Sequence, residues 1–196
     1  AGANTGKVSV IAPGGLKLTL LEGLPSAGTD GPNGLAIVGN RLYIANGEGD
    51  AFVNGPTPGT QVPNPAGMAS PLFASVIRVS FDDAPERLLA GFKLKLEDHY
   101  TLLDGNPVRL DNGLGQKATV ELVTQFRFAV PDTKQIWLNS HPYGLTALPD
   151  RPKFLYMPDA GMNTVVELNL ETGRARTLSR FPYIPNATGQ GPPVIE

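Results

Sequence analysis

The sequence predicts an all-β protein made of repeated four-stranded antiparallel units, and three observations lead to this prediction. Glycine and proline occur 23 and 19 times in 196 residues, which indicates many short elements joined by tight turns. Segments 74–92 and 163–181 align without a gap and share their alternating apolar positions. A second recurring unit precedes each of these segments, so the repeated pieces occur in the same order twice.

Segments 74–92 and 163–181 each have the pattern of a β-hairpin with one buried face. In each, an alternating strand is followed by a turn, at Asp82-Asp83 in one copy and around Gly173 in the other, and then by a second strand. A third, looser copy covers residues 7–24. The identical positions of the first two copies are Val76 and Val165, Arg87 and Arg176, Leu89 and Leu178, and Phe92 and Phe181.

The recurring unit before these hairpins is a pair of strands. GPNGLAIV (31–38) followed by RLYIAN (41–46) corresponds to HPYGLTAL (141–148) followed by FLYMPD (154–159). Together with the hairpin that follows, each pair makes four antiparallel strands, which is typical of a β-propeller blade. A β-sandwich whose hairpins are similar by coincidence is the alternative.

Two irregular stretches interrupt the repeats. Residues 47–71 are rich in glycine and proline and predict a long ordered loop or a lid. Further along, a hairpin is expected about residues 104–107 and a turn at 111–115, while the apolar segment 118–130 fits either a strand or a helix. The predicted divisions are a partial blade at 5–24, a blade at 31–92 with the long loop 47–71, a degenerate blade or insertion at 93–140, a blade at 141–182 and a connector at 183–196.

Composition excludes several classes of protein. The net charge of -2 leaves no basic surface for nucleic acid, which is therefore not an expected partner. No apolar run approaches the roughly 18 residues of a membrane-spanning helix, so a membrane partner is not expected either. The chain has no cysteine, which removes disulfides, thiolate metal ligands and thiol nucleophiles together.

The first residue and one sequon bear on localisation. The chain starts at Ala1, as a mature product would after removal of a leader, and Asn186-Ala187-Thr188 has the pattern of a glycosylation site. These features predict a secreted or periplasmic protein. The alternative is that Ala1 marks only where the expressed chain begins.

The segments NSHPYGL (139–145), LYMPDAGMN (155–163), VVEL (165–168) and RFP (180–182) resemble the ScyD/ScyE-type β-propeller proteins of scytonemin pigment clusters. The family run is closer to DSNPYGL followed by DAGGN, so His141 stands where Asn is common and Met162 where Gly is common. The resemblance implies a complete propeller about twice as long as this chain. Some members of that family are linked to oxidative pigment assembly.

About three blades would leave two apolar flanks in water, more than a monomer normally exposes. We therefore expect a hetero-oligomer in which a second polypeptide completes the ring. That polypeptide would be the C-terminal portion of a cleaved precursor or a separate subunit.

In a propeller blade, the start of the first strand and the end of the second lie on one face of the disc, near the central channel. Polar residues at those positions should therefore converge on a small-molecule site at the channel mouth. The expected catalytic residue is His141, as general base or metal ligand. The expected ligand-binding residues are Asn33, Asn46, Tyr143 and Asn163, and the expected metal ligands are Glu48, Asp50 and Asp159.

Each candidate also has a purely structural interpretation. Asp159 and Asn163 bracket a turn that they would cap, and Glu48 and Asp50 fit a solvated turn. Asn33 would stabilise its own turn. His141 would bond a neighbouring loop, and the other histidine, His99, is expected in a surface turn.

Two functions follow from these residues. The first is an enzyme, metal-assisted through calcium or magnesium, that acts on a small organic or aromatic substrate. The second is a non-catalytic binding or scaffold propeller with a structural cation. The sequence has no serine-hydrolase elbow, zincin motif or phosphate-binding glycine loop, so no nucleotide cofactor is expected.

Overall fold

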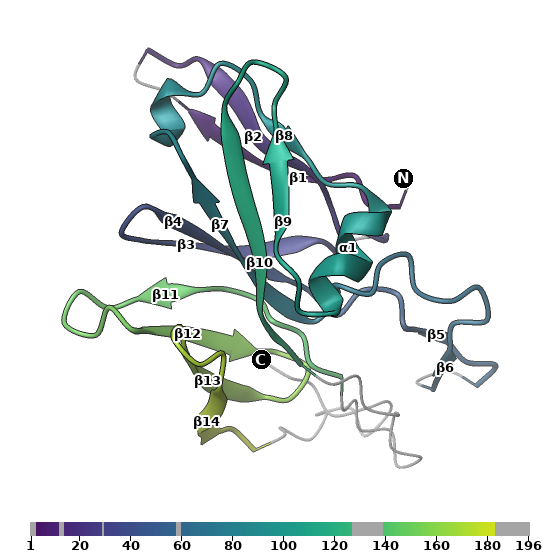
Figure 1. The fold of residues 1–196 in the computed structure, drawn as a ribbon. Coiled ribbons are helices and arrows are strands. Elements are labelled where there is room, and N and C mark those ends of the chain that lie inside the picture. Colours follow the sequence, from purple (N-terminus) through teal and green to yellow (C-terminus); the bar gives the residue numbers. More distant parts are fainter. Residues whose placement is uncertain (1–2, 12–13, 29, 58–59, 127–138, 183–196) are drawn as a thin grey trace.

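The computed structural model describes residues 3–11, 14–28, 30–57, 60–126 and 139–182, and within them the protein is mostly β, as predicted (Figure 1). The strands form several separate sheets, and one short α-helix packs beside them. In the part of the chain that is described, no helix has the length and apolarity needed to cross a membrane.

The largest sheet is antiparallel and has the strand order β3-β4-β7-β10-β9. Its β4 strand is apolar on both faces, with Ile44 on one side and Tyr43 on the other, so both faces can be covered. Its strands are β3 (Pro32–Val38), β4 (Arg41–Asn46), β7 (Ser75–Phe81), β10 (Lys117–Gln125) and β9 (Val108–Asp111).

A four-stranded antiparallel sheet has the order β11-β12-β13-β14. Its last two strands form the hairpin predicted at 163–181, which is confirmed. The outward strand β14 is exposed along its whole length. The strands are β11 (Thr146–Ala147), β12 (Phe154–Asp159), β13 (Thr164–Asn169) and β14 (Ala175–Arg180).

Four strands of the larger sheet have the same cross-strand register as the four-stranded sheet. An ion pair joins the third and fourth strands in both sheets, with the charges exchanged: Arg78 with Glu121 at 2.8 Å, and Glu167 with Arg176 at 2.6 Å. We call these two sets of four strands the first and second units. The corresponding rows are Ala36, Tyr43, Arg78 and Glu121 in the first unit, and Thr146, Tyr156, Glu167 and Arg176 in the second.

The third sheet contains the hairpin predicted at residues 7–24. Strands β1 (Gly6–Ile11) and β2 (Lys17–Leu24) pair antiparallel, and β8 (Phe92–Lys93) adds to β2 in parallel.

The hairpin predicted at 74–92 does not form, because β10 takes the place of its second strand. After β7 the chain makes a 3₁₀ turn, η1 (Pro85–Arg87), and crosses to the third sheet. There Leu88 and Phe92 are buried, at 7% and 1% exposure. Phe92 pairs with Leu21 of β2, and both buried side chains belong to the core on that side of the large sheet, which replaces the pairing that alternation alone predicted.

Segment 93–140 also differs from the prediction. A helix, α1 (Leu96–Leu103), and its turn lead into β9 where a hairpin about 104–107 was expected, and Asp98 caps the helix by accepting the Lys95 N–H at 2.8 Å. The turn at 111–115 joins β9 to β10, as expected. The apolar segment is a strand up to residue 125; residues 127–138 and the expected connector 183–196 lie outside the described residues.

The long loop 47–71 carries a small hairpin of its own, β5 (Phe52–Asn54) and β6 (Gln61–Pro63). The end of the loop is held to the first unit and to α1. Nε2 of Gln125 donates to the Pro71 carbonyl at 2.6 Å, and the Ser70 hydroxyl contacts Nδ1 of His99 at 2.8 Å. The hairpin inside this loop was not predicted from the sequence.

Two hydrophobic cores lie on opposite faces of the large sheet. One packs against β1, β2 and α1, and it includes Leu21, Ile44 and Ile77. The other lies between the first and second units, and it includes Tyr43 and Met157. The large sheet is therefore the central layer of the molecule.

Candidate functional site

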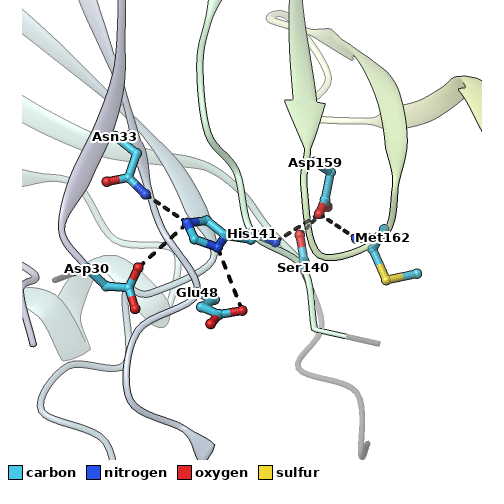
Figure 2. A network of polar contacts seen from close by, with 7 residues as sticks. All are labelled: Asp30, Asn33, Glu48, Ser140, His141, Asp159 and Met162. Atoms are coloured by element: carbon cyan, nitrogen blue, oxygen red, sulfur yellow. Dashed lines mark hydrogen bonds and ion pairs between the residues drawn. The ribbon is translucent and has the colours of Figure 1, made fainter. Parts of the chain in front are cut away.

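The candidate site lies where β3 begins, where β4 ends, and where the chain enters the second unit. His141 projects from the segment before β11 toward the first unit, and its Nε2 is 3.0 Å from Asn33 Nδ2 (Figure 2). Asn33 lies at the start of β3. The sequence predicts that Asn33 and His141 converge on one site, and in the structure their side chains are in contact.

Two carboxylates flank the same imidazole. Asp30 Oδ1 lies 3.6 Å from His141 Nε2, and Glu48 Oε2 lies 3.8 Å from Nδ1 (Figure 2). The side chains of His141, Asp30 and Glu48 are 21%, 18% and 31% exposed, so the cluster is half-buried but accessible. One imidazole from the second unit therefore stands between two acids supplied by the first.

Burial raises the pKa of Glu48 above its ordinary value, and the neighbouring Asp30 and Asp159 carboxylates raise it further, although His141 opposes the shift. Burial also raises the pKa of Asp30; His141 opposes this rise and Asp50 adds to it. Carboxyl groups with perturbed pKa values beside an imidazole are typical of functional sites.

The hydrogen bond from Asn33 orients the imidazole. When Nδ2 of Asn33 donates to Nε2, the ring proton of neutral His141 sits on Nδ1, on the side of Glu48. The Nδ1–H of neutral His141 then points toward the Glu48 carboxylate, whose Oε2 is 3.8 Å away.

Tyr143 lies next to the imidazole. The two rings are 5.6 Å apart in an edge-to-face arrangement, and Tyr143 is 60% exposed. An exposed aromatic side chain beside polar groups offers a face on which an aromatic or sugar ring can stack.

Asp159 holds the backbone that carries His141. It accepts hydrogen bonds from the His141 N–H at 2.8 Å, the Met162 N–H at 3.0 Å and the Ser140 hydroxyl (Figure 2). Asp159 is only 3% exposed. This is the turn-capping role that the sequence offered as an alternative to metal binding.

Gly47 leaves room for the site. A Cβ at this position would lie 2.5 Å from Asn33 Nδ2 and 3.3 Å from both His141 Nε2 and Asp30 Oδ1. Any side chain on residue 47 would therefore displace Asn33 and crowd the imidazole.

Three expected site residues lie elsewhere or are engaged elsewhere. Asn46 lies on the same face of β4 as Ile44, which is the face turned away from the second unit. Its side-chain amide donates to Ser75 Oγ at 3.0 Å. Asn163 has a φ of 51° and donates to the Phe181 carbonyl at 2.9 Å. Asp50 accepts the N–H of Ala69 at 2.9 Å.

The expected metal set of Glu48, Asp50 and Asp159 is not gathered around one point. Within the described ranges, no group of three or more His, Asp or Glu side chains is arranged to hold a metal ion. The hydrogen bonds that Asp50 and Asp159 accept from backbone N–H groups account for their orientation.

Asp30 is the site residue that the sequence argument missed, although the repeat contained a signal for it. When the two units are aligned on Gly34 and Gly144, Asp30 corresponds to Ser140, which directly precedes His141. Both residues lie just before the first strand of their unit.

No family model, curated protein or solved structure matches the chain. The resemblance to ScyD/ScyE-type propellers stays a prediction.

Proposed function

We propose that the His141 cluster binds a small organic molecule and exchanges a proton with it. The observation that supports this most strongly is the placement of His141, from the second unit, between Asp30 and Glu48 of the first. A carboxylate–imidazole pair of this kind acts as a general acid or base, which typically contributes about 10²- to 10⁴-fold to a rate.

The chemistry of the cluster indicates the ligand. The two carboxylates accept hydrogen bonds, so they favour a ligand with hydroxyl or ammonium donors. The exposed Tyr143 ring favours a flat apolar group on the same molecule. Phenols and aromatic amines combine these features.

The proposed setting of this site is a β-propeller of which the two units are successive blades. Equal register in both units, and the contact between their first strands, support this arrangement. A divalent cation is not part of the proposal, because two of its three expected ligands already accept backbone N–H bonds.

The test uses tyramine, which carries both a phenol and an ammonium group, as the first probe. Binding measured by calorimetry should weaken about tenfold or more in His141→Ala and Glu48→Gln, which corresponds to about 1.4 kcal/mol each. The bonds of Asp159 to backbone N–H groups do not depend on the imidazole, so His141→Ala should fold.

The matched control is a pair of exposed tyrosines. Tyr143→Ala should weaken binding, whereas Tyr100→Ala, at 54% exposure in α1, should not. A panel of phenols, arylamines and saccharides extends the test. Equal binding by wild type and His141→Ala across the panel would overturn the proposal.

The non-catalytic alternative uses the same residues without turnover. If a bound member of the panel is converted, His141→Ala should lower kcat by about 10² or more. If none is converted while binding still depends on His141, the site is a binding site only.

A further inference from the structure

A groove of about 800 Å³ opens between the third sheet and the large sheet, beside the β3–β4 turn. Strands β1, β2, β3 and β4 contribute apolar side chains to its walls. The apolar lining includes Val8, Val10, Leu20, Leu35, Ile37 and Leu42.

The β3 strand is apolar on both faces, but only one face is fully covered. Ala36 points to the second unit and is buried, at 9% exposure. Leu35 and Ile37 point the other way, into the groove, and are 49% and 71% exposed. Neighbouring apolar side chains that remain in water on a sheet face mark a surface for another element.

A free sheet edge runs along the same groove. Among the described residues β1 pairs only with β2, so its other edge has backbone N–H and C=O groups without a strand partner. Val8, Ser9 and Val10 of this edge strand line the groove. An open edge beside an apolar groove is the geometry that accepts an added β-strand.

Most charged side chains along the groove are acidic. Asp82 is bound by Arg109, whereas Asp83 and Glu86 are exposed and form no ion pair with any described residue; Arg41 is the one basic side chain among the lining residues. Two unpaired carboxylates at one end of a groove favour a partner with a basic residue there.

We propose that this groove binds an extended segment of a second polypeptide, added as a strand to the free edge of β1. Alternate apolar side chains of the segment would cover Leu35 and Ile37, and a Lys or Arg would face Asp83 and Glu86. A second copy that met this groove through its own groove fits less well, because it would bring Asp83 and Glu86 against a single arginine, Arg41.

This inference deepens the proposed propeller arrangement by locating the polypeptide that would complete it. It does not depend on the His141 cluster, which lies between the first and second units. A failure to find ligand binding at His141 would therefore not contradict the groove proposal. A failure to find peptide binding in the groove would likewise not contradict the proposal for His141.

The test uses a fluorescent peptide, Lys-Val-Thr-Val-Thr-Val-Lys with blocked ends, and measures its binding to the full chain by anisotropy. The expected result is saturable binding that weakens about tenfold in Ile37→Thr. The control is Leu89→Thr, because Leu89 is also 71% exposed but lies outside the groove. The double variant Asp83→Asn/Glu86→Gln should also weaken binding.

Two further peptides separate edge pairing from simple apolar contact. The same peptide with N-methylated central amides should not bind, and one with Glu in place of both Lys should bind more weakly. Hydrogen exchange of the β1 amides should slow when the first peptide binds.

Three outcomes would overturn the proposal. The first is equal binding of the N-methylated peptide, and the second is no binding of the Lys-ended peptide at millimolar concentration. The third is a wild-type dimer in sedimentation that becomes monomeric in Ile37→Thr while the peptide has no effect, which would assign the groove to a second copy.

Discussion

His99 shows how one buried polar side chain joins three segments. Its Nε2 donates to the Gly23 carbonyl at 2.8 Å, and its Nδ1 lies 2.8 Å from the Ser70 hydroxyl, which donates to it when the imidazole is neutral. The expectation of a surface turn here was wrong, because α1 turns His99 inward together with Leu102. The i, i+3 spacing of these two residues was the available signal.

Burial lowers the pKa of His99 below its ordinary value, and this predicts a pH dependence of stability. The unfolded chain takes up the proton first, so stability from His99 is fully present above about pH 6.5 and is lost as pH falls below it. The free energy of unfolding, from urea titrations between pH 8 and pH 5, should decrease over this range.

The substitution His99→Gln isolates this contribution. Asp30 and Glu48, whose pKa values are raised, act in the opposite direction at lower pH and are present in both proteins. The unfolding free energy of His99→Gln should therefore fall less on acidification than that of wild type. If the free energy of unfolding falls equally with pH in the two proteins, the assignment of this pH dependence to His99 is wrong.

At the scale of elements, the two units meet through corresponding glycines at the start of their first strands. A Cβ on Gly34 would lie 2.7 Å from both the Cα and the carbonyl carbon of Gly144 and 2.9 Å from the backbone nitrogen of Leu145, so all three nearest atoms are backbone. A Cβ on Gly144 would meet only Pro158, at 3.8 Å. The contact therefore requires glycine on one side only.

This asymmetry gives a matched pair of variants. Gly34→Ala should lower the free energy of unfolding by about 1–3 kcal/mol, because backbone atoms cannot rotate away from the added methyl group. Gly144→Ala should change it by much less, since its contact is an ordinary one. Urea titrations of both variants measure the difference; similar losses would show that the two strands are not held this closely.

At the scale of the whole molecule, the core between the two units joins the central sheet to the four-stranded sheet. Met157 of β12 is fully buried in it, and so are Ala45 of β4 and Val76 of β7. Because both units contribute to one core, they should unfold together.

Met157→Ala tests this coupling. Removing a fully buried methionine side chain should cost about 2–5 kcal/mol. Hydrogen exchange of the β7 amides should speed up as much as that of the β13 amides, although Met157 lies in neither strand. Faster exchange in β13 alone would show that the second unit unfolds independently of the first.

Local patterns were enough to predict the hairpins at 7–24 and 163–181, the repeated strand pairs, and the meeting of Asn33, Glu48 and His141. Alternating polarity and turn residues determine structure over a few positions, so two copies of a repeat with the same local pattern form the same strands and turns. The pairing of β10 with β7, the inward face of α1, and the separation of Asn46 from the site depend on which apolar surfaces pack together. Packing joins residues that are far apart in the chain, and only the tertiary structure contains that information.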